Sequence, residues 1–276
     1  MLRPMDRTFP RLRIAASAVL FASVGVAAAA APPGVPAAAW AEIRMLAGGI
    51  LLAAAIGPRN LAEAVRGRAR RRLALAAVAM ALFQWTFFAA VERSGPVDAA
   101  LFSTAAAPLV ARLIERGRGA GVAISAAFLA MACALAPSAG LALCLLAGGW
   151  YAGYTIFAAR DRGLAATCAA LLASGVALLP SSLATPAPVL LSAKGLAVAA
   201  YIAVAGTALA YWLYATALRE VAPASALAVQ IVQPLAAMAL GALLTGAGID
   251  ARAVLVAFLC VASSAALFFQ PQGVKP

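Results

Sequence analysis

Residues 82–93 read LFQWTFFAAVER and residues 208–219 read ALAYWLYATALR, and the two stretches align without a gap at a shift of 126 residues. The same shift places Pro108-Leu109 over Pro234-Leu235. A chain whose second half repeats its first indicates two structural units of the same kind. We therefore divide it into a first repeat at 1–137 and a second repeat at 138–276.

The composition is that of a membrane protein. Apolar residues make up 65% of the 276 residues and charged residues only 11%, whereas soluble domains have about 45–50% and about 25%. Long runs of Ala, Leu and Val favour helices over the alternating strands, of about 10 residues each, that build a barrel. Because spans in lipid must satisfy their own backbone polar groups, the sequence predicts an all-α integral membrane protein.

The chain offers ten segments that approach the length of about 20 apolar residues with which a helix crosses a membrane. They lie at 12–30, 38–57, 73–91, 96–115, 119–136, 140–159, 163–183, 194–217, 222–245 and 251–269. Five spans per repeat is an odd number, so the repeats insert in opposite directions and form an inverted 5+5 repeat. In such transporters the substrate binds near the midplane, where the repeats meet, and the protein works by alternating access.

The positions of Lys and Arg predict the orientation in the membrane. With the N-terminus in the cytoplasm, 17 of the 21 basic residues lie on that side; Arg93, Lys194 and Arg252 lie on the other, and Arg44 lies within the second span. Both termini are therefore expected in the cytoplasm, and the cluster from Arg66 to Arg72 is expected to face anionic lipid. This asymmetry explains the net charge of +12, so we expect no nucleic-acid partner.

The first span has the basic and apolar regions of a secretory signal peptide. Shifted by 126 residues, however, positions 14–30 fall on 140–156, which is the sixth span. Removal of the first span would leave one repeat incomplete, so we expect it to be retained.

Several stretches resemble a known group of transporters. They are AGTALAYWLY at 205–214, Pro223-Ala224-Ser225, Gln233-Pro234, GWYAGY at 149–154 and Glu42-Ile43-Arg44. On these residues the chain resembles the drug/metabolite transporter (DMT) superfamily, in particular its EamA-type ten-helix members, and within them it looks most like the aromatic amino acid exporters. The resemblance covers nearly the whole chain and implies a 5+5 inverted fold and export of small metabolites. Many members carry an acidic residue at the end of the ninth helix, where this chain reads LTGAG at 244–248.

Two prolines at corresponding positions are candidate hinges. Pro108 and Pro234 lie within the fourth and ninth spans, and each leaves the carbonyl four residues earlier, at Thr104 or Gln230, without its helical N–H partner. In lipid such a carbonyl needs another partner or a cavity. It can accept a hydrogen bond from a substrate ammonium or from water; the alternative is a kink whose carbonyl is satisfied by neighbouring side chains.

Polar and aromatic side chains within the spans are the candidate substrate-binding residues. A buried amide offers both a donor and an acceptor, which suits the two charged ends of an amino acid; the alternative is helix–helix contact. Tyr and Trp combine an apolar ring with a polar tip; the alternative is a belt at the membrane surface. The predicted substrate-binding set is Gln84, Phe88, Thr104, Trp150, Tyr154, Tyr211, Tyr214, Gln230 and Gln233.

The absent residue types narrow the mechanism. The chain has no His, and none of its nine acids lies at the centre of a span, whereas coupling to an ion gradient usually needs an intramembrane carboxylate or His. We therefore expect uncoupled, facilitated transport. We also expect no Lys or Arg near the midplane, and hence a neutral or zwitterionic substrate. The four cysteines, Cys133, Cys144, Cys168 and Cys260, are expected to pack as small apolar residues.

The sequence thus predicts a multi-pass exporter in a bacterial inner membrane, for aromatic and other hydrophobic amino acids. The cavity is expected between the third, fourth, sixth, eighth and ninth spans, with the fifth and tenth at the periphery. We expect no catalytic residues, metal or cofactor, and only a small-molecule substrate and lipid as partners of a monomer. The alternatives are an exporter of drugs, nucleobases or quaternary ammonium compounds with the same fold, a membrane-embedded lipid transferase and a channel.

Overall fold

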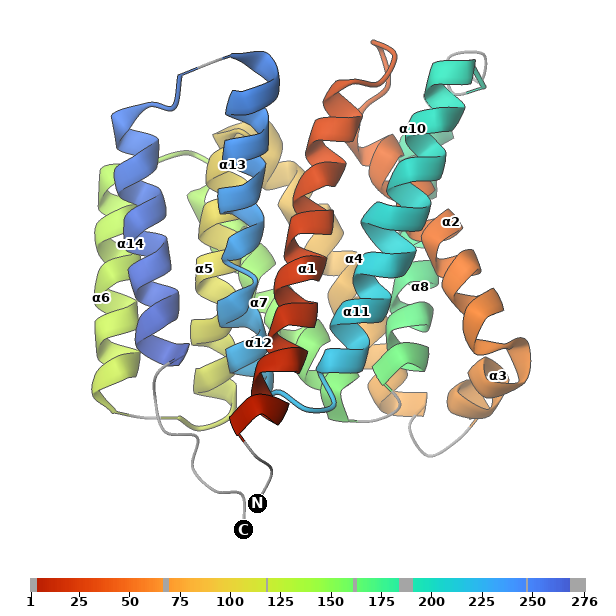
Figure 1. Ribbon diagram of the computed structural model, residues 1–276, viewed down its shortest axis with the longest axis horizontal. Helices are drawn as coiled ribbons and strands as arrows, with labels where there is room; N and C mark the ends of the chain where they lie inside the picture. Colours follow the sequence, from red (N-terminus) through yellow and green to blue (C-terminus); the bar gives the residue numbers. More distant parts are fainter. Residues whose placement is uncertain are drawn as a thin grey trace.

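Helices that run side by side make up the part of the chain that the structure describes (Figure 1). The computed structural model describes residues 4–66, 70–117, 119–160, 163–183, 191–246 and 248–268, and within these ranges it contains no strand. The first repeat contributes α1 (Pro4–Ala29), α2 (Ala37–Ile56), α3 (Pro58–Arg66), α4 (Arg70–Ser94), α5 (Pro96–Ile114) and α6 (Ala120–Leu135). The second contributes α7 (Leu141–Arg160), α8 (Gly163–Leu183), α10 (Ala193–Ala203), the π-helical turn η1 (Val204–Leu209), α11 (Ala210–Ala217), α12 (Pro223–Val229), α13 (Val232–Thr245) and α14 (Ala251–Phe268).

These helices confirm the prediction of an all-α membrane protein. Among the described residues, nine helices are long and apolar enough to cross a membrane, and α6 is a shorter apolar helix. The predicted spans agree with these helices to within a few residues at both ends, with one exception. The span predicted at 12–30 begins too late, because α1 begins at Pro4. The eighth span is formed by α10, η1 and α11 together, and the ninth by α12 and α13.

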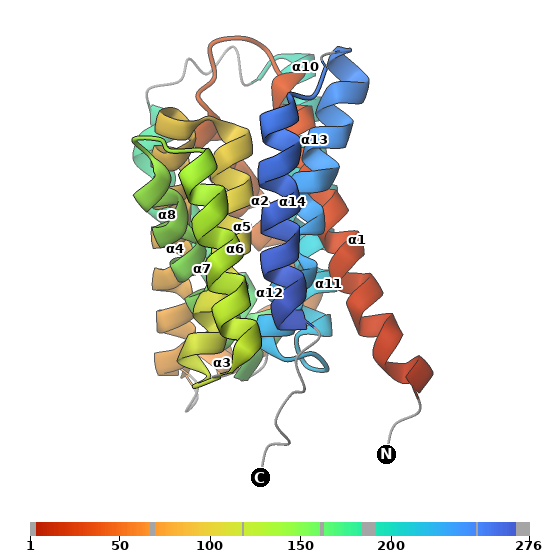
Figure 2. The same ribbon diagram turned by 90° about the vertical axis from the view of Figure 1, so that its left-hand side faces the viewer.

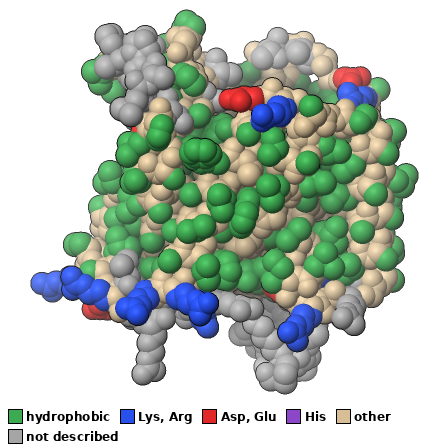
Figure 3. Space-filling view, turned by 180° about the vertical axis from the view of Figure 1, so that it is seen from behind, with side chains coloured by type: hydrophobic (Ala, Val, Ile, Leu, Met, Phe, Trp, Pro, Cys, Tyr) green, Lys and Arg blue, Asp and Glu red, His purple; other side chains and the backbone are tan. Residues whose placement is uncertain are grey.

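The outer surface is apolar in its middle and charged at its ends. Large side chains such as Ile50, Val78, Trp85 and Phe258 are between 55% and 64% exposed. Figure 3 shows this apolar band and, along its lower rim, a concentration of Lys and Arg. The lower rim is the end of the bundle at which α1 begins and α14 ends (Figure 1), and we call it the basic end. That the basic end faces the cytoplasm stays a prediction.

The connection between the second and third spans contains a helix that the sequence analysis missed. Gly57, with φ at 82°, ends α2 and turns the chain into α3. Leu61 packs against the main core, whereas Arg59, Glu63 and Arg66 are exposed and share the opposite face at helical spacing. The short α3 therefore lies as an amphipathic helix at the basic end, against α2, α4 and α8. Of the predicted basic cluster, residues 67–69 lie outside the described residues.

The helices α2 and α8 make reciprocal contacts. A Cβ atom at Gly49 would lie 2.9 Å from the Leu172 side chain, and one at Gly175 would lie 2.6 Å from the Leu46 side chain. The 126-residue shift relates Gly49 to Gly175 and Leu46 to Leu172. Reciprocal contacts of this kind arise where a twofold axis passes between two equivalent elements.

The packing of the other helices follows the same rule. The helix α4 packs against α7, and α11 packs against α1; likewise α5 packs against α7, and α13 against α1. The helices α6 and α14 pack against each other at one edge of the bundle (Figures 1 and 2), where the fifth and tenth spans were expected. The seam between the repeats therefore runs along α1, α2, α4, α7, α8 and α11, and it contains the largest buried core of the described residues.

Candidate functional site

Four tyrosines meet where α7 and α11 approach each other. The rings of Tyr151 and Tyr214 are stacked, with centroids 6.3 Å apart and planes at 15°. Tyr151 also stacks on Tyr154 at 5.9 Å, and Tyr154 meets Tyr211 edge to face at 6.3 Å. None of the four is more than 8% exposed. We call Tyr151, Tyr154, Tyr211 and Tyr214 the tyrosine cluster.

Side chains of the first repeat close the tyrosine cluster from the other side of the seam. Phe21 of α1 meets the ring of Tyr211 edge to face at 4.7 Å, and Phe83 of α4 lies 5.0 Å from Tyr151. The Tyr211 hydroxyl donates to Met80 Sδ at 3.8 Å. Such ring contacts prefer the edge-to-face and offset arrangements seen here. The tyrosine cluster is thus contacted by both repeats.

Two hydroxyls of the tyrosine cluster have partners on neighbouring helices. The Tyr154 hydroxyl shares a hydrogen bond with Thr167 Oγ1 at 3.0 Å, and the Tyr214 hydroxyl shares one with Thr155 Oγ1 at 3.1 Å. Gln84 of α4 is 2% exposed, and its amide donates to Met45 Sδ at 3.5 Å and Met80 Sδ at 3.8 Å. Thioether sulfur is a weak acceptor, so this amide holds donor capacity that a ligand can use.

Arg44 of α2 also reaches the tyrosine cluster, contrary to the expectation that no cation would lie near the centre. Its guanidinium lies near the hydroxyls of Tyr211 and Tyr151. Its Nε atom is buried without a hydrogen-bond partner, while the residue as a whole is partly exposed. Sequence analysis placed Arg44 in the second span but gave it no role. The sequence did contain a signal for it, because Arg residues inside a membrane span are rare and mark functional sites.

Gln230 lies at a break in the ninth span. The helix α12 ends at Val229, and α13 begins at Val232. The Gln230 side chain is fully buried; its Nε2 donates to Ser17 Oγ of α1 at 3.2 Å, and its Oε1 is buried without a partner. The sequence-predicted residue therefore has one unused acceptor at the contact between the two repeats.

The two candidate hinge prolines have different effects. Both Pro108 and Pro234 are buried, but α5 continues through Pro108, whereas the helix break precedes Pro234. The carbonyl of Gln230 is not free, because it accepts the N–H of Gln233 at 2.9 Å. The Thr104 side chain is 7% exposed, and Gln233 is partly exposed, unlike Gln230.

Two of the predicted aromatic residues lie apart from the tyrosine cluster. Trp150 lines an apolar groove of about 320 Å³ between α4, α5 and α7, together with Leu75, Val78 and Ile114. These three partners are 40–55% exposed, so the groove opens on the outer, apolar surface. Phe88 is partly exposed, and its ring meets that of Phe87 at 5.8 Å. Of the predicted aromatic set, the structure brings together Tyr154, Tyr211 and Tyr214, and it adds Tyr151.

A π-helical turn immediately precedes α11, the helix that contains Tyr211. It spans Val204–Leu209, and π-helical turns inside α-helices occur frequently at functional sites. Thr207 within it is fully buried, with its hydroxyl unpartnered. It packs so closely on α2 that a Cβ atom at Gly48 would lie 2.5 Å from Thr207 Cγ2. The sequence analysis did not predict this turn, since its Ala- and Gly-rich pattern is that of any tightly packed span.

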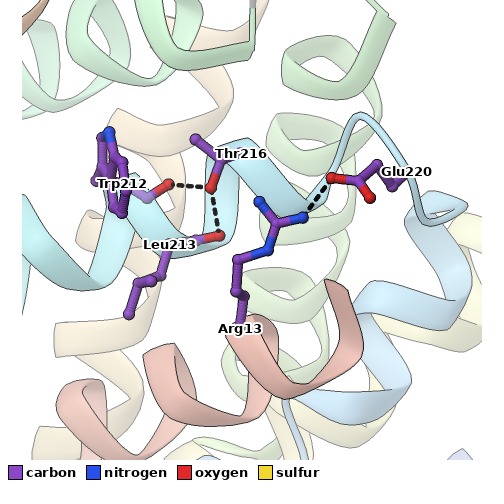
Figure 4. A network of polar contacts seen from close by, with 5 residues as sticks. All are labelled: Arg13, Trp212, Leu213, Thr216 and Glu220. Carbon is purple, nitrogen blue, oxygen red and sulfur yellow. Dashed lines mark hydrogen bonds and ion pairs between the residues drawn. The ribbon is translucent and has the colours of Figure 1, made fainter. Parts of the chain in front are cut away.

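Contacts between the repeats also occur at the two ends of the seam. At the basic end, Arg13 of α1 forms an ion pair with Glu220 in the turn before α12 (Figure 4). At the opposite end, the hydroxyls of Ser94 at the end of α4 and Ser138 just before α7 share a hydrogen bond at 2.7 Å. The tyrosine cluster lies between these two contacts along the seam.

Comparisons with known proteins agree with this architecture. A sequence model of the EamA-like transporter family matches residues 123–269. The chain is 30% identical over 248 residues to the uncharacterized transporter YwfM of Bacillus subtilis (strain 168), a match that covers 83% of each chain. A solved crystal structure, described only as that of a protein, superposes with a TM-score of 0.68 at 16% identity, over 93% of this chain and 95% of the other. At this identity the superposition shows a shared fold alone.

Proposed function

Because the chain belongs to the EamA-like transporter family, we propose that it carries a small aromatic solute along the seam between its two repeats. The observation that carries this proposal is the tyrosine cluster, in which four buried rings of the second repeat are contacted by Phe21 and Phe83 of the first. Stacked and edge-to-face rings form a surface on which another aromatic ring packs equally well. A substrate ring would separate the rings and take the place of one partner.

The proposed substrates are aromatic and other hydrophobic amino acids. Around the rings the site offers the Gln84 amide, which has only sulfur acceptors among the described residues, and the hydroxyls of Tyr154 and Tyr214. Gln230 adds an unused buried acceptor beside Ser17. These groups suit a solute with one apolar ring and a small polar end, and we assign the direction as export across a bacterial inner membrane, with both termini in the cytoplasm.

The proposed mechanism is alternating access. The repeats at 1–137 and 138–276 act as two bodies that rock about the reciprocal α2–α8 contact, where Gly49 and Gly175 let the helices approach closely. In this proposal the interrupted ninth span supplies a joint at Gln230, four residues before Pro234. Pro108 is the proposed hinge of the first repeat, within a helix that is continuous in this structure. No ion gradient is needed for this cycle, so the solute follows its own gradient.

Counterflow in proteoliposomes tests the proposal. Vesicles that contain the purified protein and one unlabelled solute, either phenylalanine, leucine, a nucleobase or a quaternary ammonium compound, are diluted into the same solute in labelled form. We expect saturable accumulation of phenylalanine, weaker accumulation of leucine and none of the other two. Accumulation of the nucleobase or the quaternary ammonium compound alone would assign the alternative substrate class, and flux that does not saturate would indicate a channel.

A further inference from the structure

Arg44 is a positive charge inside the helix bundle that the packing of the rings does not require. Its guanidinium lies near the hydroxyls of Tyr211 and Tyr151, yet the core around these rings is otherwise built from apolar side chains, mainly Ala, Leu, Met and aromatic residues. Intramembrane Arg residues face the bundle interior and pair with other groups, and they mark substrate or ion pathways. An anion that pairs with Arg44 is therefore expected.

No carboxylate of the described residues forms an ion pair with Arg44. The ion pair recorded among these residues joins Arg13 to Glu220. Glu42 is near in sequence, but residues two apart in a helix do not face each other. The Tyr211 hydroxyl donates to Met80, and the Gln84 amide joins Met80 to Met45, the residue that follows Arg44. Tyr211 therefore gives the guanidinium a neutral neighbour only. With Nε unpartnered, Arg44 keeps a donor for an anion that the described residues do not supply.

The position of Arg44 matches the polar end of a solute whose ring lies in the tyrosine cluster. Tyr211, which lies near Arg44, is in edge-to-face contact with both Phe21 and Tyr154. A guanidinium presents parallel N–H donors whose geometry fits the two oxygens of a carboxylate. In an aromatic amino acid, two carbon atoms separate the ring from the carboxylate. One such molecule can therefore contact the tyrosine cluster with its ring and Arg44 with its carboxylate.

We propose that Arg44 binds the carboxylate of the substrate and thereby restricts the transported solutes to aromatic carboxylates, including amino acids. This inference rests on the proposed function and replaces the earlier expectation of a site without a cation. The carboxylate neutralises Arg44 in the loaded protein, while the Tyr211 hydroxyl holds the guanidinium in place in the empty one. Nucleobases and quaternary ammonium compounds lack the group that Arg44 recognises, so they are excluded.

Three probes separate the two ends of the substrate. Phenylalanine has both charges, 3-phenylpropionate lacks the ammonium, and phenylethylamine lacks the carboxylate. Each competes with labelled phenylalanine in the counterflow assay and is tested for a shift in Tm of the purified protein. We expect phenylalanine and 3-phenylpropionate to compete and phenylethylamine to be at least about tenfold weaker, as for the loss of a hydrogen-bonded charge pair.

Variants of Arg44 test whether this residue causes the preference for a carboxylate. Arg44→Gln should weaken phenylalanine and 3-phenylpropionate by about 10- to 100-fold and leave phenylethylamine unchanged, and Arg44→Lys should restore part of the loss. Arg93→Gln is the matched control, because Arg93 is exposed and donates to the Ala89 carbonyl of its own helix. If Arg44→Gln does not fold, the probe preference of the wild type and of Arg44→Lys still decides. If the wild type transports phenylalanine and phenylethylamine competes equally well, the proposed role of Arg44 is wrong and the proposed function stands. If phenylalanine is not transported at all, both proposals fail.

Discussion

Arg13 of α1 forms an ion pair with Glu220, which lies in the turn between α11 and α12 (Figure 4). The 126-residue shift relates Glu220 to Ser94 and Arg13 to Ala139. Ser94 in turn shares a hydrogen bond with Ser138, the residue next to Ala139. Equivalent positions of the two repeats thus form a contact at each end of the seam. The contact is an ion pair at the basic end and a hydrogen bond between two hydroxyls at the opposite end. In an alternating cycle, each contact has to open in turn.

Breaking the Arg13–Glu220 pair should change transport more than stability. The two side chains are 21% and 50% exposed, and pairs of this kind contribute about 0–1 kcal/mol to folding. Glu220→Gln should therefore lower Tm by only a few degrees but alter the maximal counterflow rate severalfold, because it loosens one end of the seam. The exchanged pair Arg13→Glu with Glu220→Arg should recover the wild-type rate. A rate that is unchanged in the single variants would remove this contact from the transport cycle.

Replacing Tyr151 separates its ring from its hydroxyl. Tyr151→Phe keeps the stacking on Tyr154 and Tyr214 and should leave the apparent affinity for phenylalanine within about fivefold, since a single hydrogen bond contributes about 1 kcal/mol. Tyr151→Ala removes the ring, and truncation of a buried aromatic residue costs about 3–5 kcal/mol. We expect it to lower Tm and weaken binding at least tenfold. The control is Tyr201→Ala, whose ring is 43% exposed; equal effects of the two Ala variants would contradict the proposed site.

Gln230→Leu should lower transport without a loss of stability. In the wild type, Oε1 is buried without a partner, and a buried unsatisfied acceptor costs about 1–3 kcal/mol. Ser17, which accepts from the Gln230 amide, also donates to the Ile14 carbonyl at 2.6 Å, so it keeps a partner in the variant. A Tm equal to or above that of the wild type together with reduced counterflow would indicate a role in binding. Gln233→Leu is the control, and unchanged transport in Gln230→Leu would exclude Gln230 from the site.

The helices could be predicted from the sequence because hydropathy and turn residues act locally. Gly95-Pro96 separates α4 from α5, and the predicted span at 96–115 matches Pro96–Ile114. Which side a helix presents to its neighbours is a different question. Ala and Leu cover every face of these helices, so no apolar stripe marks the buried side. For this reason Trp150 and Tyr154, four residues apart in α7, were expected in one cavity, although Trp150 lines the outer groove.

The internal repeat also does not predict which side of each helix is buried. Trp85 and Tyr211 align at the 126-residue shift, yet Trp85 is 59% exposed and Tyr211 is 2% exposed. Tyr151 and Tyr154 align with Gly25 and Ala28, so the first repeat has no ring to match theirs. The repeat preserves the course of the helices, whereas the tyrosine cluster belongs to one repeat and depends on which helix packs beside it. Arg44 was missed for a related reason, because its role depends on Tyr211, 167 positions away.

Transport should not respond to an imposed ion gradient. The polar groups that the described residues place at or next to the tyrosine cluster are the hydroxyls of Thr155 and Thr167, the Gln84 amide and the Arg44 guanidinium, and the chain has no His. Coupling to protons or sodium needs a site that binds the ion in one step of the cycle and releases it in another, usually a carboxylate or a His. Phenylalanine uptake into liposomes should therefore reach the same final ratio with and without a pH or sodium gradient, while valinomycin and potassium hold the membrane potential at zero. Accumulation several times above equilibrium in either gradient would show that a coupling ion binds and would overturn facilitated transport.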